Sequence, residues 1–331
     1  MAETESRDVV VIGAGPAGLS AALVLGRARR SVTVVDAGRP RNGCSAAVHG
    51  FLTRDGAAPA DFLAVARREV SGYGVEIVAD EASAVVVEDA DAPSLRVELA
   101  GGRHLRARRV VVASGIVDEL PDVVGLAERW GRDVLHCPYC HGHEVRDRPL
   151  VVLAGDTEGA VHQALLLRQW SEDVTVVTHA AGPVDDDVLL AARGVQVVSG
   201  RAREVVTGDD GVTAVLLDDG TRVACGAVFV APRFRLNSAA LEGLGARTVD
   251  SDMGTALDAD DEGRTSVPGV WAAGNVVDLS CQVLGAAELG SRAAIGINGE
   301  LALADARAAA QGLESAQHAG PGGEKTRDTV Q

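Results

Sequence analysis

The first part of the chain alternates short uncharged runs with turn residues. Residues 8–12 predict a strand buried on both faces, 13–18 a tight glycine-rich turn, 19–29 a helix and 31–35 a second strand. Continuous runs of Val and Ile are typical of parallel sheets whose two faces are covered. These elements therefore form one strand–helix–strand unit.

The same plan begins again at residue 150, where a second strand, turn, helix and strand follow one another. The other predicted strands are 75–78, 84–87, 95–99, 110–113, 150–153, 174–177, 195–198, 203–206, 213–217, 228–230 and 270–273, and the other helices 59–73, 161–170 and 283–304. This succession predicts an α/β protein with two Rossmann-like, doubly wound, three-layer nucleotide-binding domains.

The repeated plan also sets the expected domain boundaries, and 331 residues are enough for two buried cores. We expect a discontinuous first domain at 1–117 plus 236–312 and an inserted second domain at 118–235. Beyond Gln311 the residues are mostly Gly, Glu, Pro and polar. They carry too little apolar surface to order themselves, so a disordered tail is expected at 313–331.

The net charge and the N-terminal composition limit the classes of partner and the location that we expect. A net charge of -16 repels phosphate backbones and anionic lipid, which excludes nucleic acid and membrane surfaces. Residues 9–26 are uncharged, but Gly13, Gly15, Pro16 and Gly18 interrupt them, which favours a strand, turn and helix over a membrane span. The N-terminus lacks the basic region of a signal peptide, and a cytoplasmic protein is expected.

A glycine-rich motif occupies the first turn. Gly13-Ala14-Gly15-Pro16-Ala17-Gly18 follows a strand and opens a helix, and Asp36 ends the next strand. The first glycine makes the turn, the second lets a pyrophosphate approach the backbone, and the third lets helix and strand pack closely. Because Asp36 can bind ribose hydroxyls, the unit predicts a dinucleotide cofactor in the first domain.

The equivalent turn of the second domain is altered. Thr157 replaces its central glycine, and Asp156 and Glu158 would oppose phosphate binding at a helix N-terminus. The next strand is followed by no Arg for a 2′-phosphate, and an acidic run stands at 185–187. These features argue against NAD(P)H binding and favour a second domain kept as a scaffold.

Cys137-Pro138-Tyr139-Cys140-His141-Gly142-His143-Glu144 lies just before the second unit. Two thiols at this spacing can close a small ring, and a nearby imidazole lowers a thiol pKa so that thiolate is available. A zinc site would need His136, His141 or His143 as further ligands, but no second ligand pair stands at zinc-finger spacing. We therefore expect a redox pair and no metal, and an inert pair remains the other alternative.

Five cysteines cannot all pair with one another, which fits a reducing compartment with one working pair. Cys44, Cys225 and Cys281 are interpreted as small buried or half-buried hydrophobic residues. Cys281 falls in a stretch expected near the cofactor, so a role there stays open.

Together these motifs resemble the thioredoxin reductase family of flavoproteins over residues 8–310. A third motif supports the resemblance, since Pro268-Gly269-Val270-Trp271-Ala272-Ala273-Gly274-Asn275 is similar to the family's second flavin motif, with Asn275 in place of its usual Asp. The resemblance implies a thioredoxin reductase-like fold, bound FAD and a homodimer. The residues implied to lie near FAD are Gly13, Gly15, Pro16, Ala17, Gly18, Asp36, Arg41, Asn42, His49, Ser114, Gly115, Gly274, Asn275, Gln282 and Val283.

One branch of the family is closer than the rest. His141 stands where thioredoxin reductase usually has an acidic Asp, and Cys-Pro-Tyr-Cys-His-Gly is similar to the dithiol oxidases of gliotoxin and holomycin biosynthesis. The resemblance implies an FAD-dependent oxidase that closes a disulfide in a small natural-product dithiol and passes the electrons to oxygen, giving hydrogen peroxide. It implies that Cys140 faces the flavin. We expect a substrate thiolate to attack Cys137 and His141 or His143 to take the substrate proton, because a free thiol has a pKa of about 8.5 and imidazole one of about 6.5.

Two alternatives remain open at this point. An NAD(P)H-dependent thioredoxin or disulfide reductase would run the same dithiol chemistry in reverse. A non-catalytic zinc-binding or redox-sensing module would use the cysteines without a flavin. The identity of a dithiol substrate does not follow from the sequence.

Overall fold

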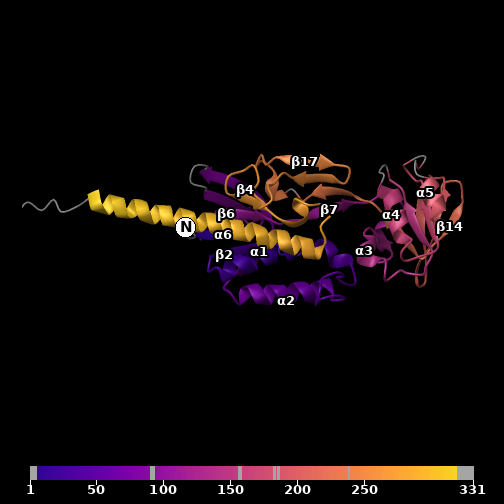
Figure 1. Cartoon of the computed structure of the whole chain (residues 1–331), viewed down its shortest axis with the longest axis horizontal. Coiled ribbons are helices and arrows are strands. Elements are labelled where there is room, and N and C mark those ends of the chain that lie inside the picture. Colours follow the sequence, from indigo (N-terminus) through magenta and orange to yellow (C-terminus); the bar gives the residue numbers. More distant parts are fainter. Residues whose placement is uncertain are drawn as a thin grey trace, which may run out of the picture.

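The computed structural model of the chain describes residues 6–89, 94–155, 159–181, 184, 187–237 and 239–318. Figure 1 shows two lobes, a larger one built from both ends of the chain and a smaller one built from its middle. The larger lobe contains the first glycine-rich turn, and the smaller one contains the cysteine pair.

A seven-stranded sheet forms the centre of the larger lobe. Strand β1 (Ser6–Ile12) pairs in parallel with β2 (Val32–Asp36) on one side and β6 (His104–Val112) on the other. The sheet continues through β3 (Glu76–Ala79) beyond β2, and through β5 (Ser94–Leu99) and β4 (Ala82–Asp89) beyond β6, while β19 (Val270–Ala272) also pairs with β6.

The two faces of this sheet bury different layers, because successive side chains of a strand point to opposite sides. Val9 and Val11 of β1 pack with α1 (Pro16–Arg27) and α6 (Val283–His318), and α2 (Pro59–Ser71) covers the same face further out. Val10 and Ile12 pack beneath a four-stranded sheet. Its strands are β17 (Thr248–Ser251), β18 (Gly254–Leu257), β16 (Arg233–Leu236) and β7 (Ile116–Glu119).

The smaller lobe holds a five-stranded parallel sheet with a three-stranded antiparallel sheet packed against it. The first has the order β11 (Gln196–Val198), β10 (Val174–Val177), β9 (Leu150–Leu153), β15 (Ala227–Val230) and β8 (Val134–Leu135), and the second β12 (Ala202–Gly208), β13 (Gly211–Leu217) and β14 (Arg222–Ala224). The helices are α3 (Pro138–His141), α4 (Gly159–Leu167) and α5 (Asp187–Ala192). The two-domain α/β class predicted from the sequence is confirmed.

Several short elements were not predicted. Strands β7 and β16 pair with each other where the chain crosses between the lobes, and α3 is a single turn. The 3₁₀ helices of the described residues are equally short: η1 (Arg41–Cys44), η2 (Ala127–Arg129), η3 (Ala239–Leu241) and η4 (Gly274–Val276). Segments of three or four residues are too short to show a period, so only their tertiary partners define them.

Helix α6 is longer than predicted. It continues past residue 304 to His318, because the sequence there is rich in Ala and other strong helix formers. The stretch expected to be disordered therefore begins as helix over 313–318, and residues 319–331 lie outside the described part of the chain. Among the described residues, no helix combines the length and apolarity needed to cross a bilayer.

The contact between α6 and α1 has no spare room. A Cβ added at Gly290 would overlap the backbone carbonyl oxygen of Ala17, whereas a Cβ at Gly299 in the same helix would meet nothing. We expect Gly290→Ala to lower the free energy of unfolding by about 1–3 kcal/mol, because the two helices must move apart. Urea unfolding measures this, with Gly299→Ala as the matched control, which should stabilise the protein by up to about 1 kcal/mol. Equal effects of the two substitutions would contradict this packing.

Candidate functional site

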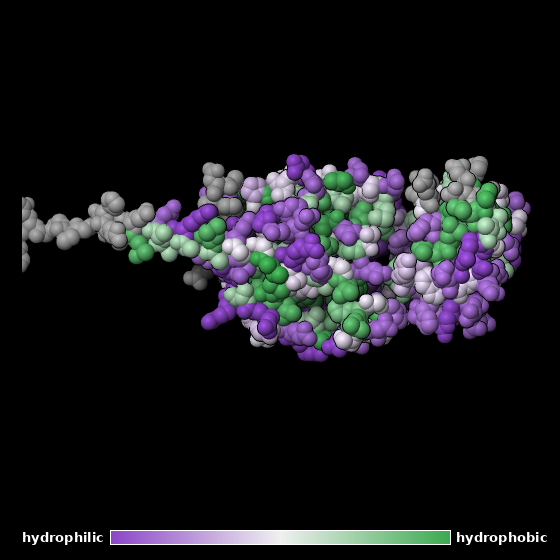
Figure 2. Space-filling view, in the orientation of Figure 1, coloured by the Kyte–Doolittle hydropathy of each residue, from purple (hydrophilic) through white to green (hydrophobic). Residues whose placement is uncertain are grey.

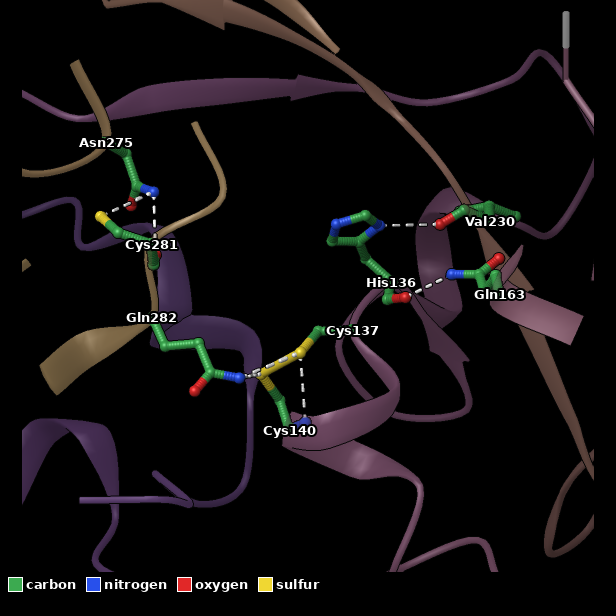
Figure 3. Close-up of a disulfide and its surroundings, with 8 residues drawn as sticks. All are labelled: His136, Cys137, Cys140, Gln163, Val230, Asn275, Cys281 and Gln282. Atoms are coloured by element: carbon green, nitrogen blue, oxygen red, sulfur yellow. Dashed lines mark hydrogen bonds between the residues drawn. A yellow bond between two sulfur atoms is a disulfide. The ribbon is translucent and has the colours of Figure 1, made fainter. Parts of the chain in front are cut away.

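Cys137 and Cys140 form a disulfide at the start of α3 (Figure 3). Cys137 is the N-cap of this helix, and Pro138 occupies its first turn, where a proline's fixed φ suits a helix start. The backbone N–H of Cys140 donates to Cys137 Sγ at 3.2 Å, and the two Cα atoms are 5.3 Å apart. The predicted pair is therefore formed, and both cysteines are half-buried.

The disulfide faces the start of α6 in the larger lobe. The Gln282 side-chain nitrogen lies 3.5 Å from Cys137 Sγ and 3.5 Å from Cys140 Sγ (Figure 3). Gln282 directly precedes Val283, the first residue of α6. Tertiary structure thus joins the two motifs expected to share the flavin.

The two candidate bases have different surroundings. His141, the last residue of α3, is half-buried, and burial lowers its pKa; nearby Glu144 opposes this shift, while His49 and His136 add to it. The imidazole is therefore neutral at neutral pH and able to accept a proton. His143 is exposed.

His136 has a structural setting beside the pair. Its ring meets the Phe234 ring edge to face, and Nδ1 lies 3.1 Å from the Val230 carbonyl oxygen. Burial lowers its pKa. The Gln163 side chain donates to the His136 carbonyl oxygen at 2.5 Å, which ties the residue before Cys137 to α4 (Figure 3).

His49 lies at the boundary between the lobes. Its Nδ1 is 3.4 Å from Asp55, and its Nε2 is 3.4 Å from Glu144 in the segment that follows α3. The resemblance implies that His49 lies near the cofactor, and the contacts of its ring in the structure are with these two carboxylates. The loop that contains it reaches the redox site from the larger lobe.

The first glycine-rich turn fits a dinucleotide. Gly13 has a φ of 102°, and a side chain there would overlap the Ala113 carbonyl, while one at Gly18 would overlap Gly13. A Cβ at Gly15 would meet nothing within 4 Å, so the backbone there is open to a close ligand. Pro16 and Ala17 form the first turn of α1, whose N-terminus favours phosphate.

Asp36 stands at the end of β2 beside a pocket. One carboxylate oxygen accepts the Ala14 N–H at 3.0 Å, and the other accepts from Arg67 of α2 at 2.7 Å. The pocket is lined by Ile12, Gly13, Val35, Asp36, Ala37, Arg39, Asp80, Glu81, Ala82, Ser114, Asn237 and Ala240. Arg67 and Asn237 were missed by sequence reasoning, since neither belongs to a motif.

Ser114 and Gly115 follow β6, and Ser114 lines this pocket. Ser114 Oγ donates to the Asn237 carbonyl oxygen at 3.1 Å, and the Asn237 side-chain nitrogen donates to the Ser114 carbonyl oxygen at 3.3 Å. Gly115 has a φ of 73° and open space where a side chain would be. The strand end is thus shaped for close approach by a ligand.

Asn275 organises the loop before α6. Its amide nitrogen lies 3.0 Å from the carbonyl oxygen of Cys281 (Figure 3). It also lies 3.1 Å from the carbonyl oxygen of Asp278 and 3.3 Å from that of Leu279. An ionised Asp could not donate these bonds, which gives a physical reason for the amide at this position. Gly274, with a φ of 79°, brings the loop against Ala17 of α1.

Arg41 and Asn42 belong to η1. The Arg41 guanidinium makes a bidentate pair with Asp118 of β7, at 2.6–3.1 Å, and covers the Phe234 ring at 4.9 Å. Arg41 therefore binds the strands that link the lobes. Among the described residues, the Asn42 carbonyl oxygen accepts the Ser45 N–H.

The altered turn of the second domain cannot be compared with the first, because its central residues are not among those that the structure describes. Asp156, Thr157 and Glu158 lie outside the described residues, as do positions 185 and 186. Within the described ranges, no group of three His, Cys, Asp or Glu side chains gathers as a metal site requires.

Comparisons with known proteins agree with this geometry. The family model described as pyridine nucleotide-disulphide oxidoreductase matches residues 7–322. Thioredoxin reductase sirT of Leptosphaeria maculans is 31% identical over 309 residues, covering 88% of this chain and 93% of that protein, and thioredoxin reductase tcpT of Claviceps purpurea is 33% identical over 225 residues, covering 65% and 70%.

Solved structures of similar fold include HlmI and an oxidoreductase from Agrobacterium tumefaciens. HlmI is 49% identical with a TM-score of 0.88, covering 94% of this chain and 97% of that one. The Agrobacterium protein is 37% identical with a TM-score of 0.84, covering 90% and 99%.

The free cysteines differ in reactivity. Cys44 is exposed, whereas burial raises the pKa of Cys225 and of Cys281 to about 12 each. Because thiolate is the reactive form, native protein with its disulfide intact should take up iodoacetamide at pH 8 on Cys44 alone. Peptide mass spectrometry checks this, with urea-unfolded protein as the control in which all three react. Rapid native labelling of Cys281 would show that it is accessible and ionised.

Proposed function

The chain belongs to the family of pyridine nucleotide-disulphide oxidoreductases as a thioredoxin reductase-like flavin thiol-disulfide oxidoreductase, and we propose that it works as an FAD-dependent dithiol oxidase. The observation that carries the proposal is that the Cys137–Cys140 disulfide faces the start of α6 and is followed directly in the chain by His141, a half-buried histidine whose pKa is lowered by burial. The resemblance of this segment to dithiol oxidases supports the same direction of electron flow.

Thiol–disulfide exchange on this pair oxidises the substrate. A substrate thiolate attacks Cys137 Sγ, the bond between the cysteines breaks, and its electron pair stays on Cys140 Sγ. The second substrate thiol, once deprotonated, attacks the substrate sulfur of the mixed disulfide and releases Cys137. The substrate loses two electrons and two protons, and the cysteine pair gains the electrons.

The residues of the larger lobe fit FAD. The open backbone at Gly15 would receive the pyrophosphate, Asp36 the ribose, and the N-terminal amides of α6 at Val283 the flavin edge. The chemistry that FAD supplies when bound is two-electron transfer from the thiol pair to oxygen, which leaves as hydrogen peroxide.

NAD(P)H is not needed in this reaction. Thr157 in place of the central glycine, with Asp156 and Glu158 on either side, would disfavour a pyrophosphate at the second turn. The reductase alternative requires that turn to bind NAD(P)H, so the two functions differ in their source of electrons.

Anaerobic mixing distinguishes them. We expect NADPH to leave the flavin band of the purified protein unchanged over seconds, and a small dithiol to bleach it, because electrons enter through the cysteine pair. Cys140→Ser should abolish the dithiol response and serves as the control. Rapid bleaching by NADPH would overturn the oxidase and support the reductase.

We propose His141 as the base for the substrate thiols. His141→Gln should lower kcat/KM for a dithiol about 10²-fold or more, with His143→Gln, at the exposed neighbour, as the matched control of smaller effect. Burial lowers the pKa of His141 below the usual histidine value of about 6.5. The neutral base therefore still predominates at that pH, and kcat/KM should fall only below it. The pH profile of kcat/KM measures this. A larger loss in the His143 variant would reassign the base.

A further inference from the structure

The side chain of Gln282 touches both reacting sulfurs. Its amide nitrogen is 3.5 Å from each Sγ, and a Cβ added at Gly50 would meet its amide oxygen at 3.8 Å. The side chain thus lies between the His49–Gly50 loop and the disulfide. It comes from the larger lobe, while the cysteines belong to the smaller one (Figures 1 and 3).

The two sulfurs have unequal sets of donors. Cys137 Sγ accepts the backbone N–H of Cys140 at 3.2 Å in addition to the Gln282 amide. For Cys140 Sγ, the donor found in the described part of the chain is Gln282. When a thiol opens the disulfide at Cys137, Cys140 Sγ receives the electron pair, and its hydrogen-bond donor is then the Gln282 amide.

The loop before α6 holds Gln282 in place. Asn275 binds the carbonyl oxygens of Leu279 and Cys281, and the Gln282 carbonyl accepts the Ala286 N–H at 2.8 Å in the first turn of α6. Asp278 closes the other side of the loop by accepting from the backbone and side chain of Ser280. The backbone of Gln282 is thus fixed on both sides while its side chain reaches the sulfurs.

An N–H donor favours a thiolate over a disulfide sulfur, because hydrogen bonds to charged acceptors are the stronger ones. We propose that Gln282 is a catalytic residue that stabilises the Cys140 thiolate formed when a thiol opens the disulfide. In that step the attacking sulfur bonds to Cys137 Sγ, the bond between the cysteines breaks, and Cys140 Sγ keeps its electron pair. This role of Gln282 rests on the proposed function in one respect, which is the direction in which the electrons move after the disulfide opens.

The thiolate of Cys140 can be titrated directly. In a Cys137→Ser background, the rate of iodoacetamide labelling at Cys140, followed by peptide mass spectrometry across pH, reports the fraction of thiolate. Gln282→Met keeps the shape of the side chain and removes the donor. We expect it to raise the labelling midpoint by about one pH unit, which is about tenfold less thiolate below both midpoints. Gln282→Glu should raise the midpoint further, because an ionised carboxylate repels the thiolate.

Gln169→Met is the matched control, since Gln169 is exposed on the smaller lobe and makes no side-chain hydrogen bond to the pair in the described residues. It should leave the midpoint unchanged. With both cysteines present, Gln282→Met should also slow anaerobic opening of the disulfide by dithiothreitol about tenfold, read by thiol labelling.

An unchanged midpoint in both Gln282 variants, together with an unchanged opening rate in Gln282→Met, would overturn the role of Gln282. The midpoint measurement uses neither NADPH, oxygen nor a natural dithiol. Reduction of the flavin by NADPH would therefore refute the oxidase and leave the result for Gln282 standing.

Discussion

The packing of α6 on α1 is the contact on which the site depends. Gly290 meets the backbone of Ala17 with no room for a side chain, and Gly274 approaches the same residue from the loop before α6. Two segments more than 250 residues apart in sequence thereby share one surface. Because the interior is close-packed, this contact also fixes where α6 begins, and Gln282 with it.

The redox site is formed where two lobes meet. The smaller lobe supplies the disulfide on a single helical turn, and the larger lobe supplies Gln282 and the loop of His49. Arg41 holds the strand that links them through its pair with Asp118. These polar contacts cross the boundary between the lobes and hold the disulfide against the start of α6.

The surroundings of the disulfide suit thiol exchange. Burial keeps His141 neutral, and an uncharged amide donates to the sulfurs. A neutral base accepts a proton from a substrate thiol, and an amide stabilises the thiolate that results. Burial raises the pKa of the Cys225 and Cys281 thiols and so keeps them protonated and unreactive, in contrast to the redox pair Cys137 and Cys140.

The sequence by itself determined the α/β class, the glycine-rich turn and the cysteine pair, because each is encoded by neighbouring residues whose spacing carries its own physical reason. It did not reveal β7 and β16, the length of α6, or the contacts of Arg67 and Asn237. Only the tertiary structure decided that His141 is half-buried and that Gln282 reaches Cys140, 142 residues away in the chain. Burial and contacts at that separation depend on how whole layers pack, and no local pattern contains that information.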